Sequence, residues 1–246
     1  MMTRPTWNLD ALIQLFMGVL VFLSVGVIIN HALLTTEELA TAEGRFLGFM
    51  IQTAVLHLGS FLCIAHFLRL HQLDWEKGFG LARVCLRKTI GLAVGVALLA
   101  TPIAMALQQL VARAMVSVNV EPRAQEVVQT LERTVQWEQQ IYFALVALVM
   151  APVIEELVFR GILYPAIRQR GFPRAALWVS ALLFAFTHAN VMTFIPLTFL
   201  ALVLTWLYER TGNILAPIVA HGTFNGINFF LVIYQHEIIE KLRAWQ

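Results

Sequence analysis

The chain has 246 residues, of which 59% are hydrophobic and 13% are charged. Soluble domains are about 45–50% apolar and about 25% charged, so this composition excludes a soluble domain and a disordered chain. The 17 basic residues nearly balance the 15 acidic ones, which excludes a nucleic-acid binder, and Cys63 and Cys85 are too few for a disulfide framework. A polytopic helical membrane protein remains.

Seven apolar segments are candidate membrane spans, since a helix that crosses a bilayer needs about 20 mostly apolar residues. In chain order, the expected spans are 11–30, 46–70, 89–111, 141–167, 175–189, 193–208 and 214–234. The first lacks a well-placed small-residue cleavage site, so we interpret it as a retained anchor. The sequence therefore predicts an all-α transmembrane helical bundle of about seven spans.

The polar segment 121–140 and the distribution of charge predict how the spans are oriented. Val127, Val128, Leu131 and Val135 recur at helical spacing in this segment, which indicates an amphipathic interfacial helix on the outer side; a solvated loop is the alternative. Eleven of the 17 Lys and Arg residues fall on the side of the N-terminus and six on the other side. By the positive-inside rule the N-terminus is cytoplasmic, and we expect a bacterial plasma membrane.

A pair of glutamates stands in the fourth expected span, where an ionisable side chain costs at least a few kcal/mol. Glu156 and Arg160 are four residues apart with the acid first, which is the favourable order for an ion pair on a helix. Pro152 is expected to kink the helix just before the acids. Glu155 points about 100° away from Glu156, so we expect it to face a polar cavity, where it can act as a base.

Two histidines occur in the later spans. His188 follows Phe184 by one helical turn, and His221 precedes Asn225 by one turn, on the same face of a helix. Counted from the Gly-Phe-Pro turn between the fourth and fifth spans, Glu155 and His188 lie at a similar depth, roughly 25 Å along antiparallel helices. The sequence thus predicts that these polar groups meet inside the bilayer.

The order Glu-Glu-x-x-x-Arg, Phe-x-x-x-His and His-x-x-x-Asn resembles the CAAX-processing and bacteriocin-processing intramembrane endopeptidases, the CPBP family, which includes the type II CAAX prenyl endopeptidases. The resemblance covers 142–230, and all three motifs match without substitution. The apolar pattern places N-terminal spans and an outer segment in 1–140 and a short polar tail in 236–246, within one integral membrane unit. The resemblance implies that 141–235 is the catalytic core. It also implies a membrane-tethered protein or peptide as substrate, prenylated in the CAAX reaction, and the lipid bilayer as partner.

The resemblance further implies roles for individual residues. These are Glu155 and His188 for activation of a water molecule, His221 and Asn225 for stabilisation of the oxyanion, and Glu156 and Arg160 for structural support. In an alternative mechanism zinc is held by Glu155, His188 and His221, since three protein ligands and a water are the usual catalytic set. No HExxH pair is present in the sequence, so a metal-free mechanism without a cofactor is favoured.

A rival interpretation is that the same residues only lock the helices together through ion pairs and hydrogen bonds. The protein would then be a non-catalytic binding or immunity protein on the same scaffold, or a small transporter with the acids as a proton relay. Transporters typically show repeat symmetry, which is not found here, and a pseudo-enzyme is expected to have lost a motif residue. The sequence therefore favours an intramembrane endopeptidase that cleaves a CAAX-like, leader or sorting-tail substrate.

Overall fold

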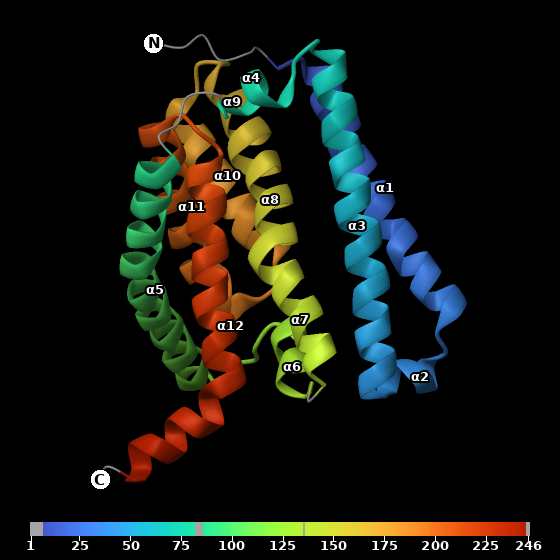
Figure 1. The fold of residues 1–246 in the computed structure, drawn as a ribbon, viewed down its shortest axis with the longest axis vertical. Helices are drawn as coiled ribbons and strands as arrows, with labels where there is room; N and C mark the ends of the chain where they lie inside the picture. The colour runs from blue at the N-terminus through green and yellow to red at the C-terminus, as the bar shows by residue number, and fades with distance from the viewer. Residues whose placement is uncertain (1–6, 82–85, 135, 245–246) are drawn as a thin grey trace.

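The computed structural model describes residues 7–81, 86–134 and 136–244, and describes side chains as far as residue 235. Cys85 and Val135 lie outside the described residues. Within these ranges the chain is a helical bundle without strands (Figure 1). The elements in chain order are α1 (Leu9–Leu33), α2 (Thr36–Ala40), α3 (Ala42–Leu70), α4 (Trp75–Phe79), α5 (Leu86–Ser117), α6 (Glu126–Glu132), α7 (Trp137–Leu145), η1 (Val146–Met150), α8 (Ala151–Glu156), η2 (Leu157–Leu163), α9 (Tyr164–Arg168), α10 (Pro173–Thr187), α11 (Val191–Thr211) and α12 (Leu215–Ala244).

Six helices of the described residues are long and apolar enough to cross a membrane. They are α1, α3, α5, the continuous helix from α7 to α9, α11, and α12 as far as Gln235. The remaining expected span, 175–189, is α10, which has 15 residues and rises about 22 Å, less than the roughly 30 Å hydrocarbon core. The predicted polytopic helical bundle is confirmed, with α10 too short to cross by itself.

The helices α1 and α3 form an antiparallel pair at one side of the bundle (Figure 1). The Gln52 side chain donates a hydrogen bond to the Leu23 carbonyl across this pair, at 3.2 Å. Thr53 and Tyr142 share a 2.8 Å hydrogen bond that links α3 to α7. A cavity of about 200 Å³ between α1 and α3 is lined by Ala11, Gln14, Leu15, Leu62, Cys63, His66, Phe67 and Leu70. None of the expected site residues lines this cavity.

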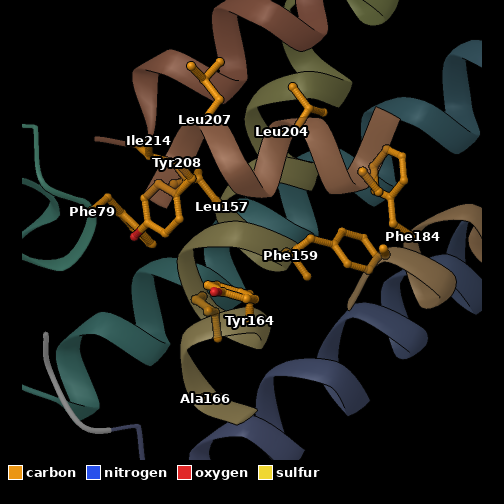
Figure 2. Close-up of a cluster of buried hydrophobic side chains, with 14 of the residues drawn as sticks. Phe79, Leu157, Phe159, Tyr164, Ala166, Phe184, Leu204, Leu207, Tyr208 and Ile214 are labelled. Atoms are coloured by element: carbon orange, nitrogen blue, oxygen red, sulfur yellow. The ribbon is translucent and has the colours of Figure 1, made fainter. Parts of the chain in front are cut away.

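The short helix α4 closes the end of the bundle near the N-terminus (Figure 1). Phe79 is fully buried and belongs to the hydrophobic cluster that also contains Ile214 (Figure 2). The Ile214 N–H donates to the Phe79 carbonyl at 3.2 Å. Gly80 adopts a left-handed φ of 71°, and a Cβ there would collide with the Gly212 carbonyl oxygen. Glycine is therefore required where this loop meets the turn between α11 and α12.

The segment 121–140 contains α6 and the first residues of α7, separated by a short connection. The helical interpretation is confirmed over the seven residues of α6, in which Leu131 is buried and Val127 is exposed. The end of the bundle that carries α6 is opposite the end that carries α4 (Figure 1). The segment 236–246, expected to be a short polar tail, continues α12 as far as Ala244.

Candidate active site

The helix that carries both glutamates is widened twice by π-helical turns. In η1 the Ala151 N–H bonds to the Val146 carbonyl five residues back, and a corresponding bond closes η2. Each π turn is followed, two residues after its end, by a proline, Pro152 or Pro165. Such turns are frequent at functional sites and offset the helix that follows them. The disturbance expected at Pro152 thus takes the form of the π turn η1 just before it, and η2 lies just before Pro165.

Glu156 is the centre of a buried ionic cluster. Its Oε1 accepts a hydrogen bond from Arg160 at 2.8 Å, and both side chains are buried, with at most 1% of either exposed. The same oxygen lies 2.8 Å from Nδ1 of His221. Arg160 also donates to the Ala201 carbonyl at 3.1 Å and places its guanidinium 4.5 Å from the centroid of the Phe184 ring. The predicted ion pair is confirmed, and it also joins α8 to α11 and α12.

Glu155 remains 29% exposed, and its Oε2 lies 3.9 Å from Nε2 of His221. This oxygen is buried and has no hydrogen-bond partner among the described residues. His221 therefore lies between the two adjacent glutamates, one at each ring nitrogen. A carboxylate only accepts hydrogen bonds, so we place a proton on Nδ1, toward Glu156, which in neutral imidazole leaves the lone pair of Nε2 toward Glu155.

His188 caps the end of α10 and is half-buried. Its Nδ1 lies 2.9 Å from the Phe184 carbonyl oxygen, which only accepts, so Nδ1 carries the proton and Nε2 presents a lone pair. The centroid of the Phe184 ring lies 5.0 Å from that of His188 and 5.6 Å from that of His221. Phe184, labelled in Figure 2, thus brings the two histidines to the same part of the bundle.

The turn after α10 is held by the segment that precedes α6. Ala189 has a φ of 47°, which is strained for a residue with a Cβ. Asn190 caps α11, with Oδ1 accepting from the Thr193 N–H at 3.0 Å, and its amide donates to the Arg123 carbonyl at 2.9 Å. The Gln125 amide donates to the Thr193 hydroxyl at 3.0 Å. These bonds provide partners for the Thr193 N–H and the Arg123 carbonyl in the irregular backbone next to α10.

Asn190 and Gln125 were not among the residues expected from the sequence. An asparagine just before an apolar segment is a common N-cap, so Asn190 carried a readable signal for the start of α11. Gln125 carried none, because its partner is 68 residues away. Both residues contact the turn that follows His188. Asn190 bonds to the main chain at Arg123, and Gln125 bonds to the side chain of Thr193.

Asn225, which is expected to stabilise the oxyanion, has one donor already occupied. Its Nδ2 donates to the Ala147 carbonyl in η1 at 2.9 Å. A primary amide carries two N–H groups, so one remains for another acceptor. Asn225 therefore contacts the helix that carries the glutamates, at Ala147, which is about two turns before Glu155.

The alternative zinc site does not assemble in this arrangement. Among the described residues, no three His, Cys, Asp or Glu side chains come together closely enough to hold a metal ion. Glu155 and His221 approach each other, but His188 does not join them as a third ligand. The donor set present thus does not fit zinc without rearrangement.

Residues 137–227 match the model of a protein family described as "Type II CAAX prenyl endopeptidase Rce1-like". The matched range contains all six expected site residues, and it confirms the resemblance carried by the three motifs. With its six candidate spans among the described residues, the chain is an integral, multi-pass membrane protein, and residues 137–227 are similar to the Rce1-like family.

Three curated proteins are similar over part of the chain. The "Putative membrane peptidase YdiL" of Bacillus subtilis (strain 168) is 30% identical over 97 residues, which is 39% of this chain and 38% of that protein. The "UPF0177 protein YxdF" of Lactococcus lactis subsp. lactis (strain IL1403) is 27% identical over 78 residues, 31% of this chain and 42% of that protein. The "Uncharacterized protein YpbD" of Bacillus subtilis (strain 168) is 30% identical over 86 residues, 33% of this chain and 41% of that protein.

The chain thus spans about two fifths of the length of the curated relatives that it matches. No solved structure matches it.

Proposed function

We propose that the chain is an intramembrane endopeptidase that hydrolyses a peptide bond in a membrane-tethered protein or peptide. The observation that carries this proposal is the position of His221 between Glu155 and Glu156, with the Phe184 ring next to both His188 and His221. Such a set of a partly exposed carboxylate and two oriented imidazoles suits the activation of water. The Rce1-like family match supports the same class of reaction.

In the proposed reaction Glu155 is the general base. The carboxylate takes a proton from a water molecule, whose position is fixed by a hydrogen bond to Nε2 of His188. The water oxygen attacks the peptide carbonyl carbon, and the carbonyl electron pair moves to its oxygen. Glu155 then returns the proton to the amide nitrogen as the C–N bond breaks, which gives a free amine and a carboxylic acid. No added oxidant or cofactor is needed for this balance.

His221 and Asn225 are proposed to stabilise the oxyanion. In this role Nδ1 of His221 donates to Glu156, and Nε2 must carry a proton of its own to donate to the developing negative charge. The N–H of Asn225 that does not bond to Ala147 supplies a second donor. Preorganised donors of this kind are worth about 3–4 kcal/mol each in acyl-transfer enzymes.

The substrate is proposed to be a CAAX-like, leader or sorting-tail peptide held at the membrane by its own anchor, with prenylation as one form of anchor. We also propose that the N-terminus is cytoplasmic in a bacterial plasma membrane, because the basic residues are concentrated on that side. In that orientation the end of the bundle closed by α4 faces the cytoplasm and the end carrying α6 faces outward.

The proposal is tested with purified protein in proteoliposomes and a library of quenched peptides that carry a prenyl or acyl anchor. The wild type and Glu155→Ala are compared with Glu138→Ala, an exposed acid at the start of α7. We expect cleavage by the wild type and by Glu138→Ala, and none by Glu155→Ala at an unchanged melting temperature. Equal cleavage by Glu155→Ala, or no cleavage by any variant, would favour the non-catalytic binding, immunity or transport function.

A further inference from the structure

Pro152 deprives one carbonyl group of its main-chain partner within the span that carries the glutamates. In η1 the hydrogen bonds run from residue i to residue i−5, as the Ala151–Val146 bond shows. The next donor in this series is residue 152 and its acceptor is the carbonyl of Ala147, but proline has no N–H group. In a bilayer every backbone polar group must be satisfied within the protein, so this carbonyl needs another donor.

The side chain of Asn225 supplies that donor, with Nδ2 2.9 Å from the Ala147 carbonyl oxygen. One turn earlier on the same face of α12, His221 bonds to Glu156 at 2.8 Å. The two contacts join the same two antiparallel helices at two levels. Together they fix the register of α12 against the helix that carries the glutamates.

A close approach of the two helices accompanies these contacts. Gly222 lies between the two levels, and a Cβ at this position would stand 2.5 Å from the Leu148 carbonyl oxygen. Leu148 is the residue four before Pro152, so its carbonyl is the other one that a helix proline leaves without its usual partner. On α12, Gly222 therefore leaves room for the Leu148 carbonyl and Asn225 donates to the Ala147 carbonyl, the two groups that lack a partner because of Pro152.

We propose that Asn225 is a positioning residue, which replaces the N–H group that Pro152 lacks and thereby sets the register at which His221 meets Glu155 and Glu156. Its effect on turnover rests on the proposed peptidase function, whereas its effect on stability does not. The role is distinct from that of an oxyanion donor, because it acts through Ala147 and not on the substrate.

The experiment is a double-mutant cycle of Asn225→Ala and Pro152→Ala in the full chain. Alanine at 152 restores an N–H group that can bond to the freed carbonyl. Asn228→Ala is the matched control, because Asn228 lies on the same helix and donates to Phe224 of that helix at 2.8 Å. Thermal unfolding in detergent is measured for every variant, together with kcat and KM on an anchored peptide.

In the wild-type background we expect Asn225→Ala to lower the melting temperature by roughly 3–8 °C, the effect of an unsatisfied buried carbonyl in a chain of this size. Asn228→Ala is expected to change it far less. We expect Asn225→Ala to lower kcat by at least about a hundredfold with little change in KM, because the variant loses the proposed oxyanion donor and also misplaces the catalytic groups. In the Pro152→Ala background the loss of melting temperature is expected to shrink by at least half, and the loss of kcat is expected to shrink to that of the oxyanion donor alone.

Equal losses of melting temperature in the two backgrounds, or equal losses of kcat, overturn the proposal. If Pro152→Ala does not fold, Asn225→Leu decides, since a side chain of similar size without N–H groups cannot donate to the Ala147 carbonyl. A wild-type melting temperature for Asn225→Leu overturns the proposal, and a loss like that of Asn225→Ala supports it. If the wild type shows no turnover, the proposed function fails, and the melting temperatures alone decide whether Asn225 replaces the missing donor.

Discussion

Nδ1 of His221 and Oε1 of Glu156 lie 2.8 Å apart, and both side chains are buried. Because the carboxylate can only accept, this contact fixes the tautomer of His221 and directs Nε2 toward Glu155. The second glutamate of the motif therefore does more than neutralise Arg160. It orients the imidazole, and it joins the helix of the acids to α12 within the same cluster.

The first prediction concerns Glu156, whose removal leaves Arg160 buried with its charge unpaired. Breaking a buried ion pair costs about 3–5 kcal/mol, so we expect Glu156→Ala to unfold or aggregate in mild detergent. Thermal unfolding and size-exclusion chromatography check this, with Glu138→Ala as control. The double variant Glu156→Gln with Arg160→Met is expected to recover most of the stability, because replacing both charges by groups of similar volume is often neutral. A melting temperature near that of the wild type for Glu156→Ala would contradict the structure.

The second prediction concerns Asn190, which caps α11 and donates to the Arg123 carbonyl. Loss of an N-cap costs about 1 kcal/mol, so Asn190→Ala should lower the melting temperature only slightly. Since the turn it holds follows His188 directly, we expect a larger effect on kcat than on stability. Thr198→Ala is the control, because the Thr198 hydroxyl donates to the Phe194 carbonyl of its own helix. Similar kcat values for the two variants would show that this turn does not position His188.

The third prediction compares two glycines one turn apart on α12. A Cβ at Gly222 would lie 2.5 Å from the Leu148 carbonyl oxygen, whereas a Cβ at Gly226 would make an ordinary 3.5 Å contact with the Leu148 side chain. We expect Gly222→Ala to lose about 1–3 kcal/mol by overpacking, together with most of its activity. Gly226→Ala should be neutral or slightly stabilising, because alanine is the better helix former. Equal melting temperatures of the two variants would contradict the close approach of α12 to this carbonyl.

The fourth prediction concerns metal ions, since Glu155, His188 and His221 do not form an assembled set of three ligands in the described residues. We expect a strong chelator to leave the turnover of the wild type unchanged, and added zinc not to raise it. The measurement is cleavage of the anchored peptide before and after dialysis against the chelator. Loss of activity that zinc restores would assign the three side chains as ligands, and would require His188 to move toward the glutamates.

Much of the fold could be predicted from the sequence because it depends on local properties of the chain. Long apolar segments must become helices in a bilayer, and each of the seven expected spans is a helix. The Glu156–Arg160 pair was equally predictable, since four residues on a helix place two side chains on one face. The short length of α10 was equally evident, because the expected span 175–189 is no longer than the 15 residues of this helix.

The composition and the three motifs by themselves determined the class of protein and the residues of the candidate site. Only the tertiary structure decided how those residues meet. His221 reaches Glu156 across 65 residues of chain, and Asn225 reaches Ala147 across 78. Such contacts depend on the register and rotation of packed helices, and a π turn shifts both for every residue that follows. Residue types and spacing along one helix cannot specify that relation, because it is set by the packing of two helices against each other.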